Sequence, residues 1–202
     1  AGGQGGNAAV MAKKSEKTNA LRLLDKLKIP YEAHSYPCEE FTGGEDVARQ
    51  LGLDPADVCK TLVTVGKSGG HFVFVLPVTG ELDRKKAAAL VGEKSLEMLH
   101  VKDLLAVTGY VRGGCTALGM KKQFPTVFHE TAESLPQVAV SAGKIGYQVV
   151  CDPKDLMFCT GSKLLEDFKG RKLIAFGGEW SVGFLTKHNP GLVLDDWLTV
   201  SK

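Results

Sequence analysis

The first residue that could do chemistry is a lysine set among apolar neighbours. Lys60 lies between Val58 and Leu62 in the run DPADVCKTLVTV, residues 54–65. A lysine amine is costly to bury, so it must reach water or a partner. On spacing alone, the commoner case is a surface lysine whose stem packs on a strand. The alternative is a fixed cation at the mouth of a pocket, placed for a phosphate or a developing oxyanion.

Two glycine-rich segments follow expected strands: GYVRGGCTALGMKKQFP at 109–125 and VSAGKIG at 140–146. Glycine permits positive φ and lets a ligand approach backbone N–H groups, although ordinary hairpin turns use glycine too. Neither segment contains a dinucleotide-binding or P-loop motif. Lys121 and Lys122 could hold RNA phosphates or could be a solvated surface pair. We expect both glycine segments and Lys60 to converge at one rim of a curved sheet.

The cysteines do not indicate a metal or disulfide framework. Their number is odd, their spacing is irregular, and neither C-x-x-C nor a zinc-type Cys/His spacing occurs. We expect reduced, mostly buried thiols, no metal and no cofactor. Cys115 lies in a glycine-rich turn, which makes it a candidate nucleophile. No His or Asp stands beside it in sequence to activate it, so a structural role is favoured.

Length and charge restrict the class of protein. The chain has 202 residues, of which 44% are hydrophobic and 24% charged, which suits one globular domain with a sizeable core. The net charge of +2 favours RNA contact through a local patch rather than through bulk charge. We find no apolar run of transmembrane length and no secretory signal, and therefore expect a cytoplasmic protein that does not contact a membrane.

The elements that would position these residues begin with short helices and strands. Thr18 can cap a helix that ends at Leu27, and a strand is expected over 31–36. A helix over 45–51 ends before Gly52. Asp54 with Pro55 is a helix-start pattern, which places Lys60 at the joint between that helix and a strand over 61–65.

The rest of the chain predicts a hairpin followed by alternating helices and strands. Strands at 61–66 and 71–76 flank the turn KSGG, and Asp83 can cap a helix that ends at Gly92. Residues 97–100 fit a strand or a loop. Further expected elements are a helix at 101–107, strands at 110–112, 126–129, 138–141 and 147–151, and a helix from Asp152 to about Cys159. This order favours a single α+β domain with a curved, mixed, mostly antiparallel sheet and helices packed around it.

The two ends of the chain differ in composition from the middle. Residues 1–17 open with the glycine-rich run AGGQGGNAAV, which we interpret as a disordered lead or a non-native remnant, with Met11 as a candidate native start. Residues 171–202 carry both tryptophans and lie outside the expected domain at 18–170. This extension could supply strands, an interaction tail or a swapped segment.

The ordered runs LGLDPADVCKTLVTV, LPVTGELDRKKAAALVG, TGYVRGGCTALGMKKQFPTVF and VSAGKIG resemble the YbaK/EbsC family of aminoacyl-tRNA deacylases. The resemblance covers about residues 18–170 and is closest to the YbaK branch, which acts on Cys-tRNA(Pro). The related editing domain of bacterial prolyl-tRNA synthetases shares the pattern more loosely. The resemblance implies a single α+β domain that clears mischarged tRNA(Pro) in trans.

The resemblance also implies a set of site residues. The lysine that the family requires falls on Lys60, as the catalytic residue. The implied substrate-binding residues are Tyr36, Thr61, Gly113, Gly114, Ser141, Ala142, Gly143 and Gln148. Two of these depart from the family pattern, because Ala142 replaces a glycine and Gln148 replaces an aspartate. The second change removes a carboxylate from the expected site.

The chemistry implied is cleavage of an amino-acid ester on the terminal ribose of tRNA. Such an ester is already activated, so positioning and oxyanion stabilisation could suffice. For a cysteinyl ester, the family resemblance implies that the substrate's own thiol attacks the carbonyl. Ala, Ser or Thr esters are alternative substrates, and a non-catalytic module that binds the tRNA end or a synthetase is the alternative of another class. Expected partners are tRNA(Pro) and prolyl-tRNA synthetase.

Overall fold

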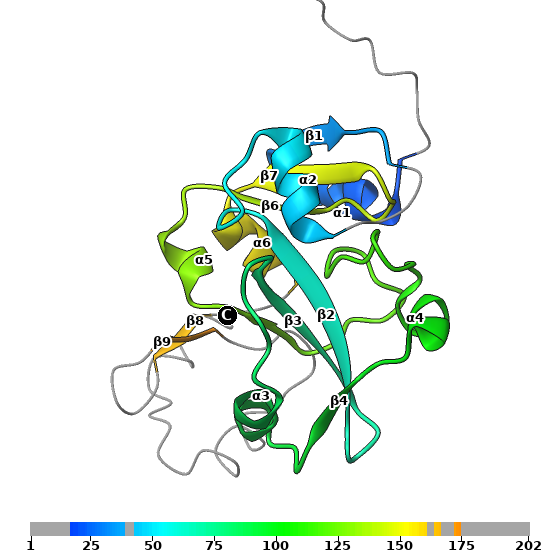
Figure 1. Ribbon diagram of the computed structural model, residues 1–202, viewed down its shortest axis with the longest axis vertical. Helices are drawn as coiled ribbons and strands as arrows, with labels where there is room; N and C mark the ends of the chain where they lie inside the picture. Colours follow the sequence, from blue (N-terminus) through cyan, green and yellow to red (C-terminus); the bar gives the residue numbers. More distant parts are fainter. Residues whose placement is uncertain (1–16, 39–42, 161–163, 167–171, 175–202) are drawn as a thin grey trace, which may run out of the picture.

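The computed structural model describes residues 17–38, 43–160, 164–166 and 172–174. Its strands form two larger sheets and a separate pair (Figure 1). The first sheet has the order β1 (Glu32–Ser35), β7 (Tyr147–Cys151), β6 (Val138–Ser141). The second has the order β4 (Leu96–Met98), β2 (Cys59–Gly66), β3 (His71–Pro77), β5 (Thr126–Phe128). The pair consists of β8 (Leu164–Glu166) and β9 (Lys172–Ile174).

All strand pairs are antiparallel except β3 with β5, which is parallel. An isolated parallel bridge between Val58 and Ala139 joins the two larger sheets. The helices are α1 (Asn19–Leu27), α2 (Gly44–Leu51), α3 (Arg84–Val91), α4 (Val101–Thr108), α5 (Thr131–Ser134) and α6 (Pro153–Cys159). The expected α+β class with mostly antiparallel strands is therefore confirmed, with the strands divided between two bridged sheets.

The three-stranded sheet is covered on both faces. On one face, Val140 and Val149 pack with Leu24 of α1 and Leu156 of α6 in a buried cluster. On the other face, Ala139 and Val150 pack with α2. Burying a Val or Leu side chain stabilises a fold by about 1.5–3 kcal/mol relative to exposure, so this sheet is a rigid support for the residues at its ends.

Most predicted helix ends are confirmed because they depend on local capping. The Thr18 hydroxyl accepts a hydrogen bond from the Leu21 amide at the start of α1, and Gly52 ends α2 in the left-handed conformation. The Asp83 carboxylate accepts from the first turn of α3, and Asp152 caps α6. The 61–66 and 71–76 hairpin is also found, with both strands slightly longer than expected.

The helix expected from Asp54 is wrong. Residues 54–57 form a turn, in which the Asp57 amide donates to the Asp54 carbonyl at 2.9 Å. The next carbonyls are committed to the sheets, because Asp57 accepts from the Ala139 amide and Val58 from the Val78 amide. Lys60 is consequently not at a joint but inside β2, paired with Leu76.

The strand expected at 110–112 is also wrong, and α5 was not expected. The Tyr110 hydroxyl donates to the Leu118 carbonyl at 2.6 Å and closes the segment into a loop. The Gly114 amide donates to the Val111 carbonyl within this loop. None of the helices in the described part of the chain is long and apolar enough to cross a membrane. The expected disordered lead (1–17), apart from Lys17, lies outside the described residues, and so does most of the expected extension (171–202).

Candidate active site

A cavity of about 750 Å³ lies where the two sheets meet. Its walls come from β2, the first turn of α2, the loop after α4, α4 itself and the adjoining ends of β6 and β7. The lining side chains that the argument uses are Glu45, Asp46, Lys60, Thr61, Met98, Val101, Leu104, Arg112, Gly113, Cys115, Ser141 and Gln148. The expected convergence of the two glycine segments with the lysine strand on one place is therefore found, although at a sheet junction.

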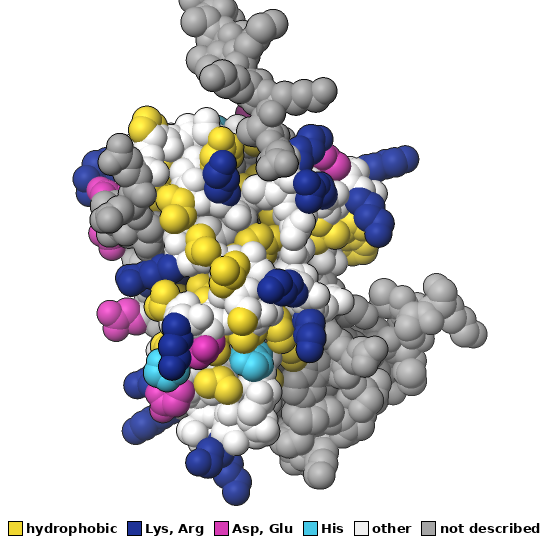
Figure 2. Space-filling view, turned by 90° about the vertical axis from the view of Figure 1, so that its right-hand side faces the viewer, with side chains coloured by type: hydrophobic (Ala, Val, Ile, Leu, Met, Phe, Trp, Pro, Cys, Tyr) yellow, Lys and Arg dark blue, Asp and Glu magenta, His cyan; other side chains and the backbone are white. Residues whose placement is uncertain are grey.

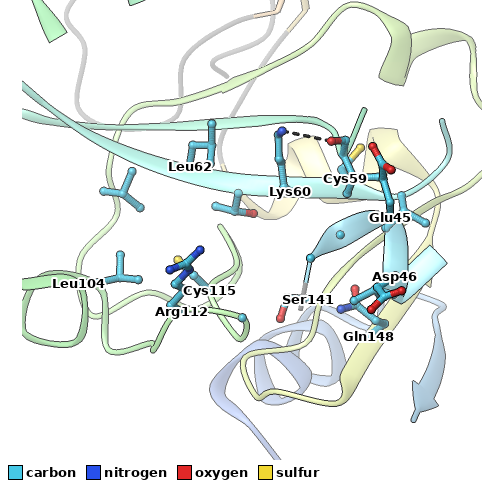
Figure 3. Close-up of a pocket in the computed structure, with 18 of the residues that line it drawn as sticks. Glu45, Asp46, Cys59, Lys60, Leu62, Leu104, Arg112, Cys115, Ser141 and Gln148 are labelled. Atoms are coloured by element: carbon cyan, nitrogen blue, oxygen red, sulfur yellow. Dashed lines mark hydrogen bonds between the residues drawn. The ribbon is translucent and has the colours of Figure 1, made fainter. Parts of the chain in front are cut away.

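Lys60 is half-buried on the cavity wall and has a protein partner. Its Nζ donates to the Val78 carbonyl at 3.2 Å. In Figure 3 the ammonium points along this hydrogen bond and away from Arg112, Ser141 and Gln148. An ammonium has three donors on a flexible stem, so the Val78 bond leaves donors available to another acceptor.

Three buried polar oxygens, two from residues that line the cavity and one from a neighbour of Gln148, have no hydrogen-bond partner in the described chain. They are Tyr36 Oη, Ser141 Oγ and Gln148 Oε1, in side chains whose residues are 7%, 9% and 5% exposed. Ser141 and Gln148 are directly opposite each other in the β6–β7 pair. An unpaired buried polar group typically costs about 1–3 kcal/mol, so a cluster of three indicates a binding site for a donor-bearing ligand.

Tyr36 is a donor in this cluster. Burial raises the pKa of Tyr36, against the opposing effect of the nearby Gln148 carboxamide, so the hydroxyl keeps its proton at neutral pH. The Gln148 side chain therefore lies close to the Tyr36 hydroxyl, although neither Tyr36 Oη nor Gln148 Oε1 makes a well-formed hydrogen bond within the described chain. A ligand atom could bridge the gap between them. Tyr36 itself is behind the residues that line the cavity rather than among them.

The glycine-loop residues divide into two roles. Gly113 lines the cavity with φ +84°, and no described residue accepts a hydrogen bond from its amide. Gly114 instead packs against the Lys144 backbone, where an added Cβ would lie 3.1 Å from three backbone atoms. An added Cβ at Gly143 would lie 2.8 Å from the Tyr110 ring. Gly114 and Gly143 therefore hold the two loops together.

Ala142 has a similar supporting role. Its amide donates to the Tyr147 carbonyl at 3.0 Å, and its carbonyl accepts from the Thr18 hydroxyl at 2.5 Å. The Gly114 amide is likewise used, by Val111. The glycine-loop amides were expected to hold the aminoacyl group, and among the loop glycines Gly113 lines the cavity and has an amide with no acceptor among the described residues.

Two cysteines line the cavity, and both are held as thiols. Burial raises the pKa of Cys115 to about 11, although a hydrogen bond with Thr108 opposes the shift. Burial, with the Asp57 charge, raises the pKa of Cys59 to about 12. The thiolate is the reactive nucleophile, so neither side chain is activated at neutral pH. This supports the structural interpretation of Cys115.

Several lining residues were not found by sequence reasoning. The first turn of α2 contributes Glu45 and Asp46, and Asp46 forms an ion pair with Arg49 at 2.7 Å. Arg112 enters from the glycine loop, and Leu104 belongs to the apolar wall. The only sequence signal was the position of Arg112 directly before the glycine pair. The other contacts arise from tertiary packing.

Comparison with known proteins gives a consistent result. Residues 39–159 match the model of the aminoacyl-tRNA editing domain. EbsC of Enterococcus faecalis, a proposed Cys-tRNA(Pro)/Cys-tRNA(Cys) deacylase, is 45% identical over 159 residues, which are 77% of this chain and 97% of EbsC. A proline–tRNA ligase of Shouchella clausii is 29% identical over 106 residues, 52% of this chain but only 18% of the ligase.

The fold comparison agrees. The crystal structure of a proposed trans-editing enzyme for prolyl-tRNA synthetase superposes with a TM-score of 0.63 and 24% sequence identity. The match covers 74% of this chain and 96% of that structure. At this identity the likeness concerns the fold.

Proposed function

Because the chain belongs to the aminoacyl-tRNA editing domain family, we propose that it deacylates mischarged tRNA in trans, with Cys-tRNA(Pro) as its main substrate. The observation that carries the proposal is the unpaired polar cluster of Tyr36, Ser141 and Gln148 at the end of a cavity with a lysine on its wall. An aminoacyl ester brings an amino group with N–H donors, which the Ser141 and Gln148 oxygens can accept.

Two groups are available for the charge that develops on the ester carbonyl oxygen. One is the amide of Gly113, a lining residue whose N–H has no acceptor in the described chain, and the other is the Lys60 ammonium after it leaves the Val78 carbonyl. Donors aimed at the developing charge stabilise an oxyanion, and a charged donor does so more strongly than a neutral amide. Lys60 is therefore the proposed catalytic residue, and Thr61, the next residue of β2, lines the same wall.

The nucleophile is proposed to come from a cysteinyl substrate. Its thiol loses a proton and its sulfur bonds to the carbonyl carbon, while the ester oxygen leaves with a proton as the terminal hydroxyl of tRNA. Water then opens the cyclic thioester to free cysteine. The raised pKa values of Cys59 and Cys115 support a site that supplies no thiolate of its own.

A deacylation panel tests the proposal. Purified protein is incubated with tRNA(Pro) that carries cysteinyl, alanyl, seryl, threonyl or prolyl esters, and loss of ester is followed over time. We expect the fastest loss from the cysteinyl ester and little from the prolyl ester. A faster alanyl, seryl or threonyl reaction would reassign the substrate, because one methylene or hydroxyl changes discrimination by only about 1–3 kcal/mol. If none of the esters is hydrolysed, the proposed deacylase activity is wrong.

A non-catalytic binding module is the second candidate. Gln148 in place of a carboxylate and the Lys60 ammonium turned toward Val78 both favour it. Such a module would hold the ester without consuming it. Stable binding of cysteinyl-tRNA(Pro) over the time in which free ester persists would support the module. Rapid ester loss in the bound fraction would exclude it.

A further inference from the structure

Helix α4 carries its apolar side chains on the outside of the protein. Val101 is 60% exposed and Leu105 is 53% exposed, whereas Thr108 is the buried residue of the helix. A helix on a globular domain normally turns its apolar stripe to the core. Figure 1 shows α4 at the edge of the molecule, next to the sheet that contains β2 and β4. Its exposed residues therefore do not serve the packing of the fold.

The exposed apolar residues are concentrated in this one region. Six large hydrophobic residues of the described chain are exposed, and four of them lie within residues 98–111. We call these four, Met98, Val101, Leu105 and Val111, the α4 surface. Figure 2 looks onto this side of the molecule and shows hydrophobic side chains across the middle of the face, with Lys and Arg side chains around them and Asp, Glu and His side chains below them. Exposed apolar patches with a polar rim mark interaction sites.

The α4 surface is continuous with the cavity. Met98 and Val101 belong to both, and Leu104 of the same helix also lines the cavity. A cavity of about 750 Å³ has the size of sites that hold a drug-sized ligand, which is more than one amino acid needs. The side of the cavity formed by α4 therefore offers a path for whatever is attached to a group bound near Ser141 and Gln148.

The charges around α4 favour a polyanion. Lys102 and Arg112 are exposed beside the surface, and Lys121 Nζ donates to the Leu105 carbonyl at 3.2 Å at the end of the helix. Asp103 is the acidic residue of α4. A protein interface would need about 800 Å² and 20–30 residues on each side, which four side chains interrupted by charges do not provide.

We propose that the α4 surface binds the single-stranded 3′ end of the substrate RNA. The apolar side chains pack against base faces, and Lys102 and Arg112 contact phosphates. This inference rests on the proposed function, because the ester in the cavity must be attached to RNA. Single-stranded RNA recognition combines base faces on apolar or aromatic side chains with a positive track for the backbone.

Two RNA hairpins that carry no amino acid test the proposal, because binding can then be measured without ester hydrolysis. Both copy the acceptor stem of tRNA(Pro); one ends in a single-stranded CCA and the other is blunt. We expect the wild-type protein to prefer the first. The double variant Val101→Gln/Leu105→Gln keeps good helix formers but removes the apolar contact. It should weaken binding of the CCA hairpin by about tenfold and leave the blunt hairpin unchanged.

A matched control is available on another helix. Phe158 of α6 is 67% exposed and lies outside the cavity lining, so Phe158→Gln removes an exposed apolar side chain elsewhere. It should bind both hairpins as the wild type does. Lys102→Ala should weaken the CCA hairpin and lower its slope of log affinity against log salt by about 0.7, the value for one phosphate contact on single-stranded RNA, while the blunt hairpin changes little.

The outcomes separate this inference from the proposed function. No preference for the CCA end, or equal binding by the wild type and Val101→Gln/Leu105→Gln, overturns the inference even if the protein deacylates tRNA. A loss confined to binding of prolyl-tRNA synthetase overturns it too and makes the surface a protein interface. A CCA preference that the double variant abolishes supports it, even if no aminoacyl ester is hydrolysed.

Discussion

At the scale of single residues, the role of Lys60 depends on where its ammonium goes. It lies on the cavity wall with one backbone partner, Val78. If it stabilises the oxyanion, Lys60→Ala should lower the deacylation rate by about 10²–10³, the usual loss for one oxyanion donor. Folding should change little, because Val78 lines the cavity and water there can replace the lost donor to its carbonyl. The deacylation rates and melting temperatures of the wild type and Lys60→Ala test both expectations.

Lys60→Arg and Lys144→Ala make that experiment specific. Arginine keeps the charge but has a planar fork, so we expect poor rescue in the space of a compact ammonium. Lys144 is an exposed loop residue whose Nζ lies 5.1 Å from the centroid of the Tyr147 ring. Its alanine variant should keep most activity. Near-normal deacylation by Lys60→Ala together with a loss in Lys144→Ala would mean that the site uses the other lysine.

Tyr36 and Tyr110 make a matched pair for testing the polar cluster. Both are buried, but the Tyr36 hydroxyl has no partner in the described chain, whereas Tyr110 donates to the Leu118 carbonyl at 2.6 Å. Tyr36→Phe should leave the free energy of unfolding unchanged or raise it by up to about 1 kcal/mol, since it removes an unsatisfied group. It should also raise KM if the hydroxyl binds substrate.

Tyr110→Phe should behave in the opposite way. It removes the hydrogen bond from Tyr110 and leaves the buried Leu118 carbonyl without that donor. The free energy of unfolding should therefore fall by about 1 kcal/mol or more. Urea unfolding gives the stability of both variants, and KM for the same ester shows whether either hydroxyl binds substrate. Destabilisation by Tyr36→Phe with KM unchanged would show that Tyr36 is part of the fold and not of the binding site.

At the scale of elements, glycines set how closely segments pack. Gly119 has φ +64°, and an added Cβ would lie 2.8 Å from the Asn19 carbonyl oxygen at the start of α1. Gly52 has nearly the same φ, +68°, but an added Cβ would meet nothing within 4 Å. Gly52→Ala should therefore cost about 1 kcal/mol for the left-handed conformation alone.

Gly119→Ala should cost clearly more than Gly52→Ala, because either the Asn19 backbone or the 110–119 loop must move. We expect a loss of about 2–3 kcal/mol in the free energy of unfolding. Chemical denaturation of both variants measures the difference. Equal losses would mean that the loop adapts freely and that it does not fix Gly113 on the cavity wall.

The elements that the sequence predicted well are those whose signals are local. Thr18, Asp83 and Asp152 cap helices through their own side chains, and neighbouring backbone amides are enough to identify them. The turn at Asp54 could not be predicted in this way, because the Asp57 carbonyl accepts a hydrogen bond from the amide of Ala139, which is far away in sequence. Likewise, the Tyr110 loop closes through the Leu118 carbonyl.

The same distinction applies to the candidate site. Lys60 and Gly113 stand out as residue types in a local context, and both line the cavity. That Gly114 and Gly143 pack one loop on the other, while Gly113 faces the cavity, follows from tertiary contacts that no spacing encodes. Arg112 and Leu104 are ordinary residues until the loop and α4 bring them to the same wall.

At the scale of the whole molecule, the cavity lies where two sheets meet, and contacts between distant segments fix its walls. Val58, which lines the cavity, is bridged to Ala139 of the other sheet, and the Thr18 hydroxyl donates from the start of α1 to the Ala142 carbonyl in the second glycine loop. Packed β-structure with few degrees of freedom suits a site that works by positioning an already activated ester.

The overall charge makes a prediction about tRNA binding. A net charge of +2 provides little non-specific attraction, so only a local set of cations, such as Lys102 and Arg112 beside α4, can contact phosphates. Two or three such contacts on single-stranded RNA correspond to a slope of log affinity against log salt of about −1.4 to −2.1. Binding by the isolated chain should therefore be weak and salt-sensitive, and it should discriminate little between tRNA species.

Selectivity for tRNA(Pro) would then have to come from a partner, for which we propose prolyl-tRNA synthetase. Filter binding of tRNA(Pro) and one unrelated tRNA across a salt series, with and without the synthetase, tests this. We expect similar weak affinities for both tRNAs alone and a gain specific to tRNA(Pro) when the synthetase is added. Nanomolar, tRNA(Pro)-selective binding by the isolated chain at physiological salt would contradict the prediction, since affinity and selectivity of that order require more contacts than these few cations supply.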